Sequence, residues 1–131
     1  MVKTLGGKNI IDTKKIAIEC AKIADDMKAE DICILDVRGV TFIAEYFVIC
    51  SGFNEKQLQS ITNAIETKLR SYGLKCKGLE GYTGARWILM DYGNIIVHLF
   101  DREMRRFYDL DLLWGDAPRL EWNPSVISKH Q

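Results

Sequence analysis

An acid and an imidazole, Asp91 and His98, stand in the largely apolar segment from Ala85 to Phe100. A carboxylate next to an imidazole can orient a general base, so the two residues could form a catalytic pair. The same residue types also occur on surfaces that bind another protein. A single histidine in a strand is more often a surface or hydrogen-bonded residue than a base. We therefore expect no catalytic role for His98 and treat Asp91 as a candidate interface acid.

A second candidate for chemistry is the Ser51-Gly52 turn, which joins an apolar segment to an amphipathic one. Such a turn can bind phosphate because the following helix offers free N–H groups. Nucleotidyltransferases place a Gly-Ser turn here and follow it with a strand that carries two acids for a divalent metal. Asp109 and Asp111 have the spacing of such acids, but they lie in a helical pattern, where residues i and i+2 diverge. A nucleotide-binding enzyme of nucleotidyltransferase type is therefore the weaker alternative.

The cysteines do not form a metal-binding pattern. They are Cys20, Cys33, Cys50 and Cys76. The sequence has no C-x-x-C, and its two histidines are His98 and His130. Zinc ligands usually come from close pairs of such residues, so the spacing predicts buried, reduced thiols and no metal site. No cofactor is expected.

The composition is that of a soluble, single-domain globular protein. Of 131 residues, 47% are hydrophobic and 27% are charged. No apolar run reaches the ~18 residues of a membrane span, and the first residues lack a secretory signal, so we expect a cytoplasmic protein. Lys plus Arg equals Asp plus Glu, 18 of each. Proteins that hold RNA through its phosphates carry a basic excess, so direct contact with nucleic acid is expected to be secondary at most.

Hydrophobic periodicity predicts the order α-β-β-α-β-β-β-α. The expected helices cover residues 12–28, 54–73 and 101–114, and the expected strands cover 31–37, 45–51, 75–80 and the two arms of a hairpin within 85–100. Asp12 and Asn54 are the expected N-caps, with Gln57 completing a capping box and Gly73 ending the second helix. Consecutive strands on either side of a helix imply an α/β fold, a mixed β-sheet with flanking helices. The strand order is not predicted.

Alternation along the hairpin separates its side chains into two faces. The turn is Tyr92-Gly93 or Gly93-Asn94, and both sort the residues identically. The first face, expected to point into the core, consists of Ile88, Met90, Tyr92, Ile95, Val97 and Leu99. The second, called the mixed face below, consists of Trp87, Leu89, Asp91, Ile96, His98 and Phe100. Either a helix covers the mixed face or part of it receives a protein partner, because interfaces favour aromatic anchors among polar groups.

Three longer segments carry a resemblance to a known family. They are DICILDVRGVTFIAEYFVICSG, EGYTGARWILMDYGNIIVHLF and RRFYDLDLLWGDAP. Together they resemble the Iojap family, whose bacterial members are ribosomal silencing factors. The resemblance covers about Asp12 to Pro118, so we expect a flexible N-terminus (1–11), the family domain (12–118) and a C-terminal tail (119–131). It implies a nucleotidyltransferase-like fold without catalytic acids, and therefore no enzyme.

The resemblance also implies a function. Family members bind the large ribosomal subunit through ribosomal protein L fourteen, on the surface that meets the small subunit. They block subunit joining and lower translation when nutrients are scarce. Organelle members act in ribosome assembly, so a large-subunit assembly factor is an alternative. The oligomeric state stays open, a homodimer included.

The contact residues implied by the resemblance lie on the first arm of the hairpin. They are Trp87, Leu89, Met90, Asp91 and Tyr92, with Glu80 nearby. Trp87, Leu89 and Asp91 belong to the mixed face, whereas Met90 and Tyr92 belong to the face expected in the core. The sequence departs from the family pattern at Glu45 and Asp111, where Asp and Glu are usual, and each departure keeps the charge.

Overall fold

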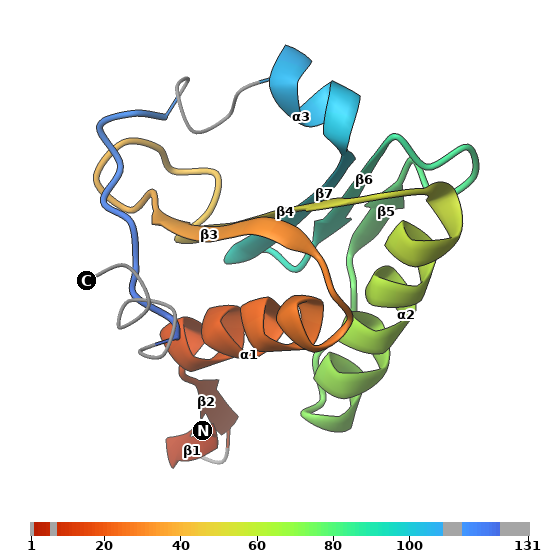
Figure 1. Cartoon of the computed structure of the whole chain (residues 1–131). Coiled ribbons are helices and arrows are strands. Elements are labelled where there is room, and N and C mark those ends of the chain that lie inside the picture. The colour runs from red at the N-terminus through yellow and green to blue at the C-terminus, as the bar shows by residue number, and fades with distance from the viewer. Residues whose placement is uncertain (1, 6–7, 109–113, 124–131) are drawn as a thin grey trace.

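A five-stranded mixed sheet forms the centre of the computed structural model, with helices on both faces. The structure describes residues 2–5, 8–108 and 114–123. The helices are α1 (Thr13–Asp26), α2 (Glu55–Ser71) and α3 (Arg102–Phe107). Helices α1 and α2 pack on one face of the sheet, while α3 and residues 114–117 lie on the other (Figure 1). The predicted α/β class is confirmed.

The sheet is mixed because one of its four strand pairs is parallel. Its strands are β3 (Glu30–Asp36), β4 (Tyr46–Gly52), β5 (Gly78–Glu80), β6 (Trp87–Asp91) and β7 (Ile95–Asp101). Their spatial order is β3-β4-β7-β6-β5, with β4 and β7 parallel and the other neighbours antiparallel. A parallel pair needs a crossover, which here contains α2, β5 and β6. This places the 85–100 hairpin beside β4, with its second arm, β7, as the central strand of the sheet.

Both long helices begin at the predicted caps. The Asp12 carboxylate accepts a hydrogen bond from the Lys15 backbone N–H at 3.2 Å, and the Asn54 side chain accepts one from the Gln57 N–H at 2.8 Å. The Gln57 side chain in turn accepts from the Phe53 N–H at 2.6 Å, so the box closes one residue earlier than predicted. These bonds satisfy N–H groups that the first helical turn leaves free.

The hairpin turns at Gly93-Asn94, one of the two predicted positions. Trp87 pairs with Phe100, and the Tyr92 N–H donates to the Ile95 carbonyl at 2.9 Å. Gly93 has a φ of 87°, which a first central residue of a type II′ turn requires and glycine adopts readily.

The two predicted faces of the hairpin lie in separate hydrophobic clusters. Five residues of the apolar face, Ile88, Met90, Ile95, Val97 and Leu99, are buried against α1 and α2, and Tyr92 packs at the edge of that cluster. The mixed face contributes to a second cluster on the opposite side of the sheet, through Trp87, Ile96 and Phe100. The sorting derived from alternation is therefore confirmed.

The predicted C-terminal helix is only partly correct. It begins at Arg102, but Tyr108 already has non-helical backbone angles, and Trp114 lies in a turn. Trp114 packs edge-to-face on Phe47, with ring centroids 5.4 Å apart. This tertiary contact, rather than helical periodicity, determines the place of Trp114. Residues 109–113, with Asp109 and Asp111, lie outside the described residues.

Two terminal segments add structure that the sequence did not predict. Strands β1 (Val2–Leu5) and β2 (Lys8–Ile11) form a separate antiparallel pair before α1. At the other end, the Asp36 N–H donates to the Pro118 carbonyl at 2.8 Å and the Leu120 N–H donates to the Ile34 carbonyl at 2.9 Å. Residues 118–120 therefore cover the open edge of β3, which would otherwise present unpaired backbone groups. The flexibility expected for residues 1–11 stays a prediction.

The cysteines behave as small apolar residues. Cys20, Cys33 and Cys50 are buried, and Cys76 is partly buried. Burial raises the pKa of both the Cys20 and the Cys50 thiol to about 12. Both groups therefore stay neutral, as expected for structural thiols. In the part of the chain that the structure describes, no helix is long and apolar enough to cross a bilayer.

Candidate protein-binding surface

The exposure of the mixed face changes across the sheet. Strand pairing aligns Glu80, Leu89, His98 and Ile49 in one row from β5 to β4. Glu80 is exposed, Leu89 is half-buried, His98 is 6% exposed and Ile49 is fully buried. The accessible part of this side of the sheet is therefore its β5–β6 edge.

The side over β4 is covered by chain segments from the C-terminal half. Ala117 and Met104 belong to the same cluster as Phe47, and Trp114 lies edge-to-face on the Phe47 ring. The first expected alternative, a covering element, therefore holds in part, and the second, a protein partner, stays a prediction. A cover made mostly of a turn and the short helix α3 buries one half of the sheet face, and the half that carries Trp87, Leu89 and Asp91 stays half-exposed.

Trp87 is the large aromatic residue on the accessible half, and its neighbours hold it in one orientation. Its ring lies 4.8 Å from that of Phe100 and 5.1 Å from that of Tyr108. Its indole Nε1–H donates to His98 Nδ1 at 3.2 Å. A half-buried side chain that is already ordered loses little conformational entropy when a partner covers it. Trp87 therefore has the properties of a preorganised anchor.

Asp91 and His98 do not form a catalytic pair. His98 pairs across the hairpin with Leu89, and Asp91 pairs with Ile96. The Asp91 carboxylate accepts from the Gly93 N–H at 2.7 Å, an Asx-type contact within the turn. Burial lowers the pKa of His98 to about 4, so its ring is neutral at neutral pH. The prediction that His98 is no general base agrees with this geometry.

The charge of Asp91 remains available to a partner. Its side chain is half-buried, and among residues 2–5, 8–108 and 114–123 it makes no ion pair. Glu80 adds a second, exposed acid on the neighbouring strand. The accessible edge therefore combines an aromatic anchor with two carboxylates, a composition suited to a basic protein surface.

Met90 and Tyr92 lie on the other side of the sheet. Met90 is fully buried against α1 and α2, so its side chain supports β6 from the core and cannot be reached from the mixed face. Tyr92 is half-buried, and burial raises the pKa of its hydroxyl, which finds no hydrogen-bond partner in the described part of the chain. Of the six residues implied by the resemblance, four thus share one accessible surface: Glu80, Trp87, Leu89 and Asp91.

Ser51 and Gly52, expected in a turn, are the last two residues of β4, and the chain itself fills the space around them. Ser51 is 1% exposed, and its hydroxyl accepts from Arg105 Nη1 at 2.9 Å. A Cβ at Gly52 would lie 2.7 Å from Leu58 Cδ2, so the glycine is needed for close packing against α2. Asn54 caps the N-terminus of that helix. Ser51 and Gly52 therefore serve packing, as expected from the missing acid pair.

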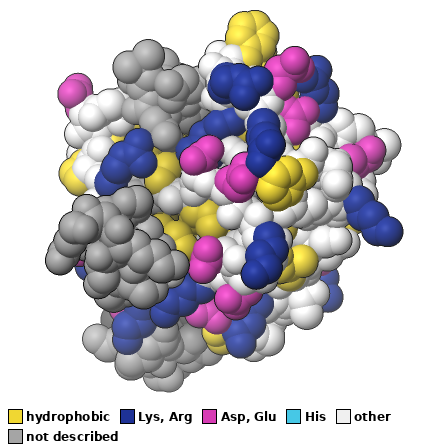
Figure 2. Space-filling view, in the orientation of Figure 1, with side chains coloured by type: hydrophobic (Ala, Val, Ile, Leu, Met, Phe, Trp, Pro, Cys, Tyr) yellow, Lys and Arg dark blue, Asp and Glu magenta, His cyan; other side chains and the backbone are white. Residues whose placement is uncertain are grey.

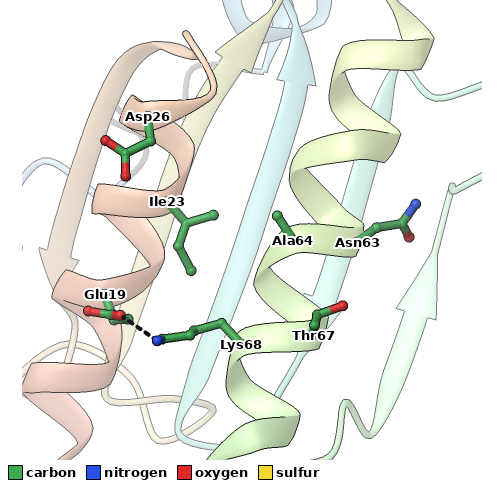
Figure 3. A pocket seen from close by; sticks show the side chains of 7 residues that line it. All are labelled: Glu19, Ile23, Asp26, Asn63, Ala64, Thr67 and Lys68. Carbon is green, nitrogen blue, oxygen red and sulfur yellow. Dashed lines mark ion pairs between the residues drawn. The ribbon is translucent and has the colours of Figure 1, made fainter.

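A surface groove of about 590 Å³ lies between α1 and α2, on the side of the sheet opposite the mixed face. Figure 3 shows Lys68 reaching from α2 towards Glu19 of α1, with which it forms an ion pair at 3.9 Å. None of the lining residues comes from the Ser51-Gly52 turn. The groove therefore adds nothing to the nucleotide alternative.

The face of the molecule in Figure 2 carries Lys and Arg side chains interspersed with Asp and Glu rather than one basic patch. Among the residues that the structure describes, several opposite charges form local pairs, such as Arg38 with Asp36 and Arg102 with Glu30. On this face, no field of one sign is available to hold a phosphate backbone.

One exposed apolar segment was missed by the sequence reasoning. In the β3–β4 connection Phe42 is fully exposed, Ile43 is 62% exposed and Val40 is 41% exposed. The Glu45 N–H at its end donates to the carbonyl of Asn94, which places the connection beside the hairpin turn. The sequence signal for this segment was the presence of three apolar residues in a short connection between two strands, where polar residues are more usual.

Comparisons with known proteins give a consistent result. A family model described as "Ribosomal silencing factor during starvation" matches residues 10–131. The chain is 42% identical to the ribosomal silencing factor of Bacillus subtilis over 82% of this chain and 92% of the relative. It is 35% identical to the chloroplastic Iojap protein of Zea mays, over 80% of this chain and 46% of the relative.

Two crystal structures share the fold. One, of a Chromobacterium violaceum protein, superposes with a TM-score of 0.77 at 28% identity and covers 80% of this chain and 88% of that one. The other, of a Bacillus halodurans protein, gives a TM-score of 0.70 at 35% identity over 84% of this chain and 97% of that one.

Proposed function

The chain belongs to the ribosomal silencing factor family, and we propose that it represses translation by occupying the large ribosomal subunit, so that the small subunit cannot join it. This act needs no bond-making. A folded domain placed on the intersubunit surface excludes the other subunit by its volume, and the extent of repression follows from occupancy. Its place of action would be the cytoplasm, under nutrient limitation.

We infer that ribosomal protein L fourteen is the direct partner and that the accessible part of the mixed face receives it. The observation that carries this assignment is the preordered, half-exposed Trp87, with Asp91 and Glu80 on the same surface. Ribosomal proteins are basic as a class, so carboxylates beside an apolar anchor suit one of them better than they suit RNA.

Co-sedimentation with separated subunits tests the proposal. The purified protein should pellet with large subunits and stay in the supernatant with small ones. Binding to both subunits, or to neither, would contradict it. Association with large-subunit precursors but not with mature subunits would favour the assembly-factor alternative. A specific calorimetric signal with ATP or CTP and Mg²⁺ would revive the nucleotide-binding enzyme.

Trp87→Ala provides the residue-level test of the surface. Truncation of an interface anchor often weakens binding by about 2 kcal/mol or more, which is roughly 30-fold in Kd. Trp122→Ala is the matched control, because Trp122 is also half-buried but packs against the cluster under α1 and α2. Unchanged co-sedimentation of a folded Trp87→Ala protein would remove Trp87 from the interface.

A further inference from the structure

The imidazole of His98 lies in surroundings that are unusual for a polar side chain. It is 6% exposed and lies among aromatic rings. The Phe47 ring meets it edge-on at 5.0 Å, and the Phe100 ring stacks on it at 6.2 Å with an interplanar angle of 9°. A phenylalanine would fill this site without burying a polar atom.

The hydrogen bonding of His98 is one-sided. Nδ1 accepts the indole N–H of Trp87 at 3.2 Å, so the ring proton must be on Nε2. Nε2 is buried and has no hydrogen-bond partner among the residues that the structure describes. A buried donor without a partner destabilises the fold. The imidazole therefore gains one bond, to Trp87, and leaves one donor unsatisfied.

We propose that His98 is a positioning residue, which holds the Trp87 indole in the orientation that the ribosomal partner binds. This inference rests on the proposed function, because it takes Trp87 to be the anchor. Phe100 and Tyr108 restrict the indole by ring contacts alone, which do not distinguish the two χ2 orientations that keep the ring in nearly the same plane. The directional bond to Nδ1 selects one of these two orientations.

The binding and stability of His98→Phe separate this role from a purely structural one. The variant should unfold at nearly the same temperature, because it removes the unsatisfied Nε2 donor but also the acceptor of the half-buried Trp87 N–H. It should also bind large subunits about 3- to 10-fold more weakly, the range of one neutral hydrogen bond. His98→Asn should recover part of the affinity, since its Oδ1 can accept at the position of Nδ1. A lower melting temperature of His98→Phe with unchanged affinity would overturn the proposal.

A double-mutant cycle tests whether His98 acts through Trp87. Trp87→Phe keeps a ring and removes the N–H, so the double variant with His98→Phe should bind no more weakly than Trp87→Phe alone. Additive losses would show that His98 acts independently of the indole and would overturn the proposal.

The free protein gives a readout that does not depend on the ribosome. The indole ¹H–¹⁵N resonance of Trp87, identified by its loss in Trp87→Phe, should move upfield and exchange faster with solvent in His98→Phe. One outcome is that the Trp87 resonance shifts in His98→Phe while Trp87→Ala still binds subunits normally. That result would refute the proposed interface, and the hydrogen bond from Trp87 to His98 would then have no role in binding. If Trp87→Ala loses binding and His98→Phe neither binds more weakly nor shifts the resonance, the proposed interface stands and the role of His98 is refuted.

Discussion

At the scale of residues, the proposed interface consists of an ordered aromatic side chain, Trp87, and two acids on the same surface, Asp91 and Glu80. The carboxylate of Asp91 also accepts from the Gly93 N–H, so a charge-reversing substitution would disturb the turn together with the charge. Asp91→Asn separates the two effects, because the amide oxygen can still accept that bond while the negative charge is lost.

Asp91→Asn is therefore expected to weaken binding to large subunits, mainly through a lower association rate at low salt. The expected loss is roughly 3- to 10-fold, and it should shrink as salt screens the interaction. Asp25→Asn, which removes an equal charge from the exposed surface of α1, should bind like the wild type. Equal association rates for all three proteins across a salt series would exclude Asp91 from electrostatic recognition.

His98 also predicts a pH dependence of stability. Burial lowers its pKa to about 4 in the folded chain, against about 6.5 when unfolded. Between these values the unfolded state binds more protons, so stability falls as the pH decreases from 6.5 to 4. The full loss is about 3 kcal/mol, from ~1.4 kcal/mol per pKa unit.

Urea unfolding of wild type and His98→Phe from pH 7 to pH 4 measures this loss. The difference in stability between the two proteins should grow in favour of His98→Phe as the pH falls. The rings of Phe47, Trp87 and Phe100 around His98 carry no charge that would compensate. Asp36 and Asp101, whose pKa values are lowered, contribute only at a still lower pH. A constant difference across the range would show that His98 binds a proton as readily in the folded chain as in the unfolded one, which contradicts the prediction.

Much of this surface could be inferred from the sequence, because alternation alone places Trp87, Leu89 and Asp91 on one side of a hairpin. The resemblance added Glu80, which lies two strands from β7 and cannot be assigned by alternation within the hairpin. The bond from Trp87 to His98 could not be inferred, since it joins residues that are diagonal rather than directly paired across the strands.

At the scale of elements, helix α2 lies on the face of the sheet away from the proposed interface, and its first turn depends on Asn54. Asn54→Ala should therefore lower the free energy of unfolding by about 1 kcal/mol. It should leave the affinity for large subunits unchanged. Chemical denaturation together with co-sedimentation checks both expectations, and a loss of affinity at intact fold would mean that α2 contributes to binding.

The elements that the sequence predicted well are those with strong local signals. Helices α1 and α2 have capping side chains and apolar stripes, and the 85–100 hairpin has a glycine turn between alternating strands. The end of α3 was wrong because Trp114 packs on Phe47, a contact between distant segments. The strand order was not predicted because the β4–β7 pair is also long-range, and local pattern carries no information about such partners.

At the scale of the whole molecule, the fold separates stability from recognition. The larger hydrophobic cluster lies beneath α1 and α2, and the accessible β5–β6 edge lies on the other side of the sheet. The net charge is zero, so orientation on a basic partner depends on where the acids lie rather than on an overall attraction. A small domain of this kind can act as a steric block at the site on the large subunit to which Trp87 is proposed to bind it.

Re-formation of whole ribosomes from separated subunits tests the central claim most directly. Purified large and small subunits are mixed after the large subunits have been incubated with excess protein, and the products are resolved on a sucrose gradient. The account predicts that the wild type and Trp122→Ala prevent joining, whereas Trp87→Ala restores it at the same concentration. Undiminished joining with saturating wild-type protein would contradict the account.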